Sequence, residues 1–214
     1  MIMWVGFDLD NTLTENTNFL YRRIEVLICE FFKSNGIDIS LDKVTDIVWN
    51  FYYLNFNLEQ EERNINSYLD TVDFLASKFN LTVDLNSLKE KILNLVNDVN
   101  NPLNYSLTKD TEYVLSTLLE RKYSLYLVTH GDYVFQVKKL LCLGIGKYFE
   151  EIHVVPFYKS KEPYIKPNSI FVGDSLINDI LPAKDKAIPV LFEKNNNFVN
   201  ITTIKDLRSL LDIL

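Results

Sequence analysis

Hydrophobic and polar residues follow two different patterns along this chain. Short apolar runs, rich in β-branched and aromatic residues, predict strands at 3–9, 124–129, 151–155, 169–173 and 188–192. Longer stretches with apolar residues at helical spacing predict helices at 112–121, 133–143, 177–186 and 204–214. Helices that alternate with strands in this way are typical of βαβ units around a parallel sheet. The two ends of the chain therefore predict an α/β domain.

The segment 16–104 interrupts this alternation. It contains no convincing strand, and its periodicity predicts helices at about 17–34, 41–55, 59–79 and 85–98. The turn-forming run Asn100-Asn101-Pro102 then marks the return to the α/β pattern. We therefore expect an α/β domain formed by 1–15 and 105–214, with an all-helical domain, 16–104, inserted after the first strand. Aromatic residues crowd one part of the insert, where we expect them to pack in a core or between domains: Trp49, Phe51, Tyr52, Tyr53 and Phe56.

The composition excludes some classes of function. The 214 residues carry a net charge of −7, and 47% of them are hydrophobic. The acidic balance argues against a protein that binds nucleic acid polymers, which normally requires a basic face. The chain reaches its first predicted strand without a cationic, apolar leader, and no apolar run approaches the ~20 residues that span a bilayer. We therefore expect a cytoplasmic protein with no membrane partner. The oligomeric state is not readable from these features.

Two carboxylates follow the first predicted strand. Asp8 and Asp10 are spaced i, i+2, so both side chains project to one side if the backbone stays extended. In open α/β sheets, ligands bind outside the carboxyl ends of the strands, which is where these acids are expected to lie. One carboxylate can attack an electrophile while the other carries a proton. The alternative is an acidic strand end that caps the following turn, and the motif by itself leaves both interpretations open.

The second predicted strand also ends in polar residues. Thr129, His130 and Gly131 follow its apolar run. A hydroxyl followed by backbone amides can hold phosphate oxygens. This pattern is common in ordinary turns, and a histidine at a strand end more often makes local hydrogen bonds than it contacts a substrate.

Two further groups complete the candidate chemistry. Lys159 and Lys161 lie in a basic segment, where one ammonium can neutralise charge on a nucleophile and a phosphate. Asp174 ends a hydrophobic strand, and Asp179 follows at the start of a predicted helix. Magnesium is usually held by one or two carboxylates together with waters and substrate phosphate. The alternatives are a solvated lysine loop and, for Asp179, an acid favoured by the helix dipole.

The order of these motifs resembles the four motifs of the haloacid dehalogenase superfamily. These motifs are a strand with Asp-x-Asp-x-Thr, a strand with Thr, a lysine, and a strand with Gly-Asp-x-x-x-x-Asp, and they cover about 1–15 and 105–192. The resemblance implies a Rossmann-like core, a required Mg²⁺ and an aspartyl-phosphate intermediate. The helical insert resembles the C1 type of cap, which closes over the site and selects the substrate.

The resemblance also implies roles for individual residues. Asp8 would be the nucleophile and a metal ligand, and Asp10 the general acid and base as well as a metal ligand through its carbonyl. Asp174 would complete the metal site, with Asp179 as a ligand through water or as a partner of the ligands. The residues expected to bind phosphate are Thr12, Thr129, His130, Gly131 and a lysine, either Lys161 or Lys159.

The resemblance therefore implies a Mg²⁺-dependent phosphatase that acts on a small phosphorylated metabolite such as a nucleotide, a sugar phosphate or phosphoglycolate. Dehalogenase members differ at the position of Asp10, which favours phosphoryl chemistry. His130 departs from the asparagine that many relatives carry there. Lys161 is preferred over Lys159, and Lys166 lies too near the next strand. Two alternatives remain open, namely a phosphomutase of the same superfamily and a non-catalytic scaffold that binds a protein.

Overall fold

A computed structural model of the chain describes residues 3–15, 17–48, 69–98, 106–131, 133–156, 159–193 and 200–214. The aromatic cluster predicted between Trp49 and Phe56 lies outside these residues. Within the part that is described, no helix is long and apolar enough to cross a membrane.

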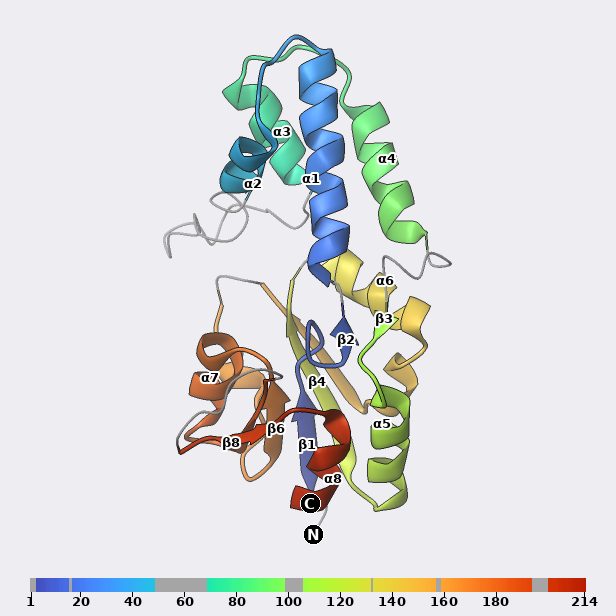
Figure 1. The fold of residues 1–214 in the computed structure, drawn as a ribbon, viewed down its shortest axis with the longest axis vertical. Coiled ribbons are helices and arrows are strands. Elements are labelled where there is room, and N and C mark those ends of the chain that lie inside the picture. The colour runs from blue at the N-terminus through green and yellow to red at the C-terminus, as the bar shows by residue number, and fades with distance from the viewer. Residues whose placement is uncertain are drawn as a thin grey trace.

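A six-stranded sheet forms the lower half of the molecule in Figure 1. All neighbouring strands are parallel, in the order β5-β4-β1-β6-β7-β8. The strands are β1 (Trp4–Phe7), β4 (Ser124–His130), β5 (Glu151–Val155), β6 (Ile170–Gly173), β7 (Ile188–Phe192) and β8 (Thr202–Ile204). The first strand lies in the middle because the chain builds β4 and β5 on one side of it and returns to build β6, β7 and β8 on the other. This is an α/β, Rossmann-like core, as predicted.

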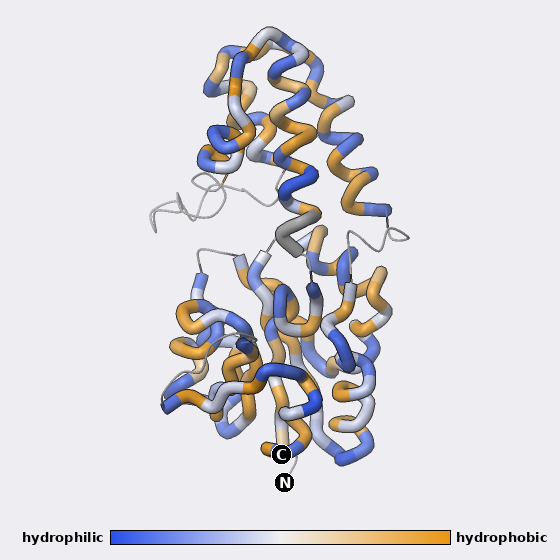
Figure 2. Tube along the Cα trace, in the orientation of Figure 1, coloured by the Kyte–Doolittle hydropathy of each residue, from blue (hydrophilic) through white to orange (hydrophobic). Residues whose placement is uncertain are grey.

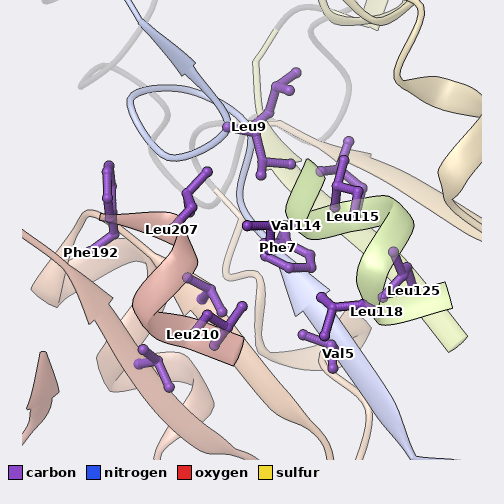
Figure 3. Close-up of a cluster of buried hydrophobic side chains, with 14 of the residues drawn as sticks. Val5, Phe7, Leu9, Val114, Leu115, Leu118, Leu125, Phe192, Leu207 and Leu210 are labelled. Atoms are coloured by element: carbon purple, nitrogen blue, oxygen red, sulfur yellow. The ribbon is translucent and has the colours of Figure 1, made fainter. Parts of the chain in front are cut away.

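One face of the sheet is covered by α5 (Thr111–Glu120), α6 (Tyr133–Leu143) and α8 (Leu210–Ile213). Alternate residues of the central strands, such as Val5 and Phe7, point to this face because side chains alternate along a strand. Figure 3 shows both side chains between those of α5 and the C-terminal residues Leu207 and Leu210. The apolar positions that predicted the strands therefore form the core that holds these helices.

The opposite face is packed by Tyr126, Phe171 and Ala183 of α7 (Leu181–Ala183). The Tyr126 ring lies directly over β1, where Gly6 has no side chain. A Cβ at Gly6 would lie 2.2 Å from the Tyr126 ring and 2.7 Å from the Phe171 ring. The ring is also fixed at its far end, where its hydroxyl lies 2.8 Å from Ser169 Oγ.

The segment between β2 (Thr14–Glu15) and β3 (Ser106–Leu107) contains a separate layer of helices, which lies above the sheet in Figure 1. It consists of α1 (Thr17–Ser34), α2 (Leu41–Val48), α3 (Asp70–Lys78) and α4 (Asn86–Asn97). Helix α1 contacts both α2 and α4. The four helices share one apolar cluster, in which Ile24, Phe32, Leu75 and Ile92 are fully buried and to which Phe135 of α6 also belongs. Figure 2 shows hydrophobic and hydrophilic residues alternating along these helices, as expected for helices with one buried face.

Two short strands connect this helical layer to the sheet. The chain leaves through β2 (Thr14–Glu15) and returns through β3 (Ser106–Leu107), and the two strands pair antiparallel. The Thr108 amide also donates to the Leu13 carbonyl oxygen at 2.9 Å. The start and the end of the helical segment are thereby held side by side.

The structure confirms the five predicted strands and corrects the C-terminal helix. The segment 204–214 was predicted as one helix, but Ile204 ends β8, and a single 3₁₀ turn, η5 (Leu207–Ser209), precedes the short α8. Asp206 lies between the strand and the turn, and its side chain accepts a hydrogen bond from the Ser209 amide at 3.0 Å. The predicted helix at 177–186 divides similarly into a π-helical turn, η4 (Leu176–Ile180), and α7. Two other 3₁₀ turns are η2 (Gly146–Tyr148) and η3 (Glu162–Tyr164).

The close approach of Tyr126 to Gly6 leads to a first prediction. Gly6→Ala should lower the free energy of unfolding by about 1–3 kcal/mol, because the new methyl group overpacks a buried ring. Gly146→Ala is the matched control, since a Cβ there meets nothing within 4 Å, and its effect should stay within about 0.5 kcal/mol. Urea unfolding followed by circular dichroism measures both variants. Equal stabilities for Gly6→Ala and the wild type would contradict this packing.

Candidate functional site

The candidate residues meet where three neighbouring strands end. Phe7 pairs with Leu127 of β4 and with Val172 of β6, so β1, β4 and β6 are in register at their carboxyl ends. Asp8 follows β1 directly, and its amide donates to the Val172 carbonyl oxygen at 2.8 Å. The register therefore brings the residues that follow each strand to one edge of the sheet.

The loop after β1 turns sharply and fixes Asp8. The amides of Leu13 and Thr14 both donate to the Leu9 carbonyl oxygen at 3.0 Å, and Asn11 takes the left-handed conformation, which asparagine tolerates better than most residues. The turn brings the buried Thr12 hydroxyl back to Asp8, where it donates to Oδ2 at 3.4 Å. Thr12 was predicted to bind phosphate, and in this structure its hydroxyl is directed at the Asp8 carboxylate.

Lys161 lies between two buried carboxylates. Its side chain is 2% exposed, and its Nζ lies 2.6 Å from Asp8 Oδ1 and 2.6 Å from Asp179 Oδ1. Burial alone would lower the pKa of this ammonium, but the charges of Asp8 and Asp179 raise it above its ordinary value. The lysine is therefore charged at neutral pH.

This position separates Lys161 from the other two lysines considered from the sequence. Lys166 pairs with Glu151 at 2.7 Å, and its Nζ lies 4.1 Å from the centre of the Trp4 ring. Lys159 reaches the site through its backbone, because its carbonyl oxygen lies 2.9 Å from His130 Nε2. Of the three lysines, Lys161 is the one whose side chain contacts Asp8.

Asp179 is positioned by the π-helical turn η4. Its side chain is buried, with Oδ1 bonded to Lys161 and Oδ2 accepting from the Ser175 amide at 2.9 Å. It packs directly on Gly173, where a Cβ would lie 2.4 Å from the Cβ of Asp179. Both carboxylate oxygens thus already hold a protein partner. π-Helical turns of this kind are frequently found at functional sites.

Asp8, Asp174 and Asp179 form an acidic cluster, in which one ligand oxygen from each lies within 4.8 Å of the others. Burial, followed by repulsion from Asp179, raises the pKa of Asp174 to about 6. Burial also raises the pKa of Asp8 well above its usual range, even beside the Lys161 ammonium. Three acids share one lysine, so the charge is unbalanced when all are ionised. Their hard oxygen donors fit a divalent cation such as Mg²⁺, which the cluster could hold.

Asp10 faces a different set of partners, on α6. Lys139 Nζ bonds to Asp10 Oδ1, and Gln136 Nε2 donates to Asp10 Oδ2 at 2.7 Å. Both α6 side chains are buried, with Lys139 3% and Gln136 0% exposed. Neither residue was predicted from the sequence. The available signal was their spacing, because polar residues three positions apart share one face of this mostly apolar helix.

Thr129 lies beside the same glutamine. Its side chain is fully buried, and its Oγ1 lies 3.3 Å from Gln136 Nε2. The structure therefore brings Thr129 and Asp10 to a common partner, as expected if both belong to one site.

His130 and Gly131 make contacts that hold the loops around the site. A carbonyl oxygen can only accept, so His130 Nε2 carries the proton that is donated to Lys159 O. Burial, followed by the charge of Lys161, lowers the pKa of His130 to about 4, which keeps the ring neutral. The amide of Gly131 was expected to face a phosphate, but it donates to the Val155 carbonyl oxygen at 3.0 Å. The Gly131 amide therefore already has a protein partner in this structure, and its contact with a phosphate stays a prediction.

Comparisons with known proteins agree with this arrangement. The model of the haloacid dehalogenase-like hydrolase family matches residues 2–185. A search of curated proteins gave no significant match. A HAD phosphatase from Thermococcus onnurineus is 22% identical, with a TM-score of 0.64 over 100% of this chain and 97% of its own.

Two other similar structures show that the fold is shared by different chemistries. YfnB from Bacillus subtilis, assigned to the HAD hydrolases and solved with magnesium bound, is 19% identical, with a TM-score of 0.63 over 100% of this chain and 98% of its own. A 2-haloacid dehalogenase from Pseudomonas syringae is 16% identical, with a TM-score of 0.67 over 100% of this chain and 98% of its own. At these identities the structures establish the fold, while the family model covers most of the chain. This chain therefore belongs to the haloacid dehalogenase-like hydrolases.

Proposed function

We propose that this hydrolase is a Mg²⁺-dependent phosphatase that acts on a small-metabolite phosphate monoester, with Asp8 as the nucleophile. The observation that carries the proposal is the combination of two acids with separate partners. Asp8 is bonded to the buried Lys161, while Asp10, two residues later, is bonded to Lys139 and Gln136. These separate partners support a role for Asp8 as the nucleophile and a role for Asp10 as the proton donor and acceptor.

The first chemical step is the attack of Asp8 on phosphorus. A carboxylate oxygen of Asp8 forms a bond to phosphorus as the bond to the leaving oxygen breaks. The Lys161 ammonium, 2.6 Å from Oδ1, offsets negative charge on the nucleophile and on the transferred phosphoryl group. Thr12 and Asp179 keep the nucleophile and the lysine in position.

Asp10 supplies the proton transfers in both steps. Its proton passes to the leaving oxygen as the ester bond breaks, and the resulting carboxylate then takes a proton from the water that hydrolyses the aspartyl-phosphate. An alkoxide is a poor leaving group, whereas a halide leaves without a proton. A well-held second acid therefore favours phosphate-ester chemistry over dehalogenation, the other activity found among structures with this fold.

The acidic cluster supports the metal requirement. Asp8 and Asp174 are the residues that would hold Mg²⁺, together with the backbone carbonyl of Asp10. Asp179 would act as their partner, since its side chain is bonded to Lys161 and to the Ser175 amide. When bound, the cation would offset the repulsion among the carboxylates and polarise the phosphoryl oxygens. The magnesium in YfnB supports this choice of ion.

The helical layer, α1–α4, is proposed to be a cap domain that selects the substrate. It is built around one apolar cluster and joins the sheet through the paired strands β2 and β3, of which β2 begins at Thr14, just after the loop that carries Asp8 and Asp10. A lid attached at this point can close over the strand ends and exclude water. Substrate size and shape would then be set by the cap, and the chemistry by the sheet edge.

The proposed nucleophile can be tested with a nearly isosteric change. Wild-type protein with Mg²⁺ should release phosphate from at least one member of a panel of nucleotides, sugar phosphates and phosphoglycolate. Asp8→Asn should lower kcat by about 10⁴-fold or more, because an amide cannot accept the phosphoryl group. Asp212→Asn, at an exposed position of α8, is the control and should keep full activity. A wild-type protein without activity on the whole panel would reject the proposal.

The raised pKa of Asp174 leads to a prediction about metal binding. Below its pKa of about 6, a proton occupies Asp174 and competes with the cation. Mg²⁺ affinity, measured by calorimetry without substrate, should fall roughly fourfold from about pH 7.5 to about pH 5.5 from this group alone. Asp174→Asn should bind Mg²⁺ much more weakly at both pH values. An affinity that is constant or higher at the lower pH would exclude Asp174 as a ligand.

A further inference from the structure

We propose that Lys139 and Gln136 are positioning residues that fix the Asp10 carboxylate for proton transfer. This inference rests on the proposed function, in which Asp10 exchanges a proton with the leaving oxygen. The two side chains lie one helical turn apart on α6 and bind different oxygens of the same carboxylate.

Lys139 is buried, so its positive charge requires a partner. Its side chain is 3% exposed, and a buried charge is strongly destabilising unless it is paired. Its partner is Asp10, whose side chain is 19% exposed and so remains accessible to a substrate. A lysine that only stabilised α6 would gain more by extending into water.

Gln136 fixes the second oxygen and connects Asp10 to the next strand. Its Nε2 lies 2.7 Å from Asp10 Oδ2, 2.6 Å from the His130 carbonyl oxygen and 3.3 Å from Thr129 Oγ1. The His130 carbonyl oxygen can only accept a hydrogen bond, and so can Asp10 Oδ2 when the carboxylate is ionised. The Gln136 side chain must therefore turn its nitrogen, not its oxygen, toward them. Among the described residues, Gln136 Oε1 has no hydrogen-bond partner. Within the described part of the chain, the Gln136 side chain therefore leaves its oxygen without a hydrogen bond while its nitrogen bonds to Asp10 and His130.

The backbone requires this support because Asp10 lies beyond the end of β1. The loop carries Asp10 through a turn rather than along a strand, so its side chain depends on other elements for its direction. Helix α6 supplies this support from a rigid element, since Leu140 is buried in the sheet cluster and Phe135 in the helical cluster. Gly131 leaves the space in which Gln136 lies, because a Cβ there would be 2.6 Å from Nε2.

Correct placement of Asp10 matters most when the leaving oxygen requires its proton. As the bond between phosphorus and the ester oxygen breaks, the proton leaves the Asp10 carboxyl and bonds to that oxygen; Lys139 and Gln136 neither gain nor lose an atom. Phenyl phosphate and p-nitrophenyl phosphate separate this role from general damage. Their rings are similar, but the p-nitrophenolate ion leaves without a proton, whereas the more basic phenolate depends on one.

The test is the ratio of kcat/KM for phenyl phosphate to kcat/KM for p-nitrophenyl phosphate, measured with Mg²⁺. We expect Lys139→Met and Gln136→Met each to lower this ratio by about tenfold, within the range of general acid catalysis. Lys139→Arg, which keeps the charge, should recover part of the ratio. Lys138→Met makes the same chemical change one position earlier on α6, at a partly exposed site, and should leave the ratio unchanged.

A double-mutant cycle shows whether the effect passes through Asp10. Asp10→Asn should lower the ratio by itself, and Lys139→Met should lower it no further in that background. Two results would overturn the inference while leaving the proposed phosphatase function in place. One is an unchanged ratio in Lys139→Met and Gln136→Met. The other is an Asp10→Asn background in which Lys139→Met lowers the ratio as much as it does in the wild type.

Two outcomes would separate the inference from the proposed function. Absence of Asp8-dependent hydrolysis of both aryl esters by the wild type would count against the function. Crystal structures of the wild type and Lys139→Met then test the positioning directly, and an Asp10 carboxylate that keeps its place without Lys139 would contradict it. If Lys139→Met does not fold, Gln136→Met and Lys139→Arg give the same comparison.

Discussion

The buried contact of Lys161 with Asp8 and Asp179 is the interaction on which the rest of the site depends. A charged group inside a protein must be paired, and removing one partner of a buried pair typically costs 3–5 kcal/mol. Asp8 follows β1, Asp179 lies in η4 after β6, and Lys161 precedes η3 in the connection between β5 and β6. One ammonium therefore ties three separate segments to the same edge of the sheet. The close packing of Asp179 on Gly173 belongs to the same constraint, since a larger residue would push Asp179 away from the lysine.

The two acids of the first motif, Asp8 and Asp10, each contact a different lysine. Two carboxylates spaced i, i+2 repel each other, and Asp10 is one of the charges that raise the pKa of Asp8. Lys161 contacts Asp8, and Lys139 contacts Asp10 from the other side of β1's carboxyl end. Each acid thereby has a cation of its own. Asp8, which lies in the acidic cluster with Asp174 and Asp179, is buried, whereas Asp10 keeps some exposure.

The sequence predicted those parts of the structure that depend on local pattern. Apolar runs gave the five strands, and the parallel arrangement then implied that the acids after β1 and β6 would lie together. Lys161 was preferred over Lys159 from the sequence, and its side chain is the one that contacts Asp8. Gln136 and Lys139 were missed because a polar residue on an apolar helix gives no indication of its distant partner. The strand β8 was missed because its three residues are too short to show alternation against the helical pattern that follows.

Helix α6 shows why the site and the helical layer are best considered together. Phe135 is buried in the apolar cluster of α1–α4, Leu140 is buried in the cluster of the sheet, and Gln136 and Lys139 between them hold Asp10. A helix packed in this way cannot shift relative to one cluster without disturbing the other, because both interiors are close-packed. The position of the second acid is therefore set by the packing of the helical layer as well as by the loop that carries it. In a hydrolase with this arrangement, the layer proposed to recognise the substrate also contacts the helix proposed to orient the proton donor.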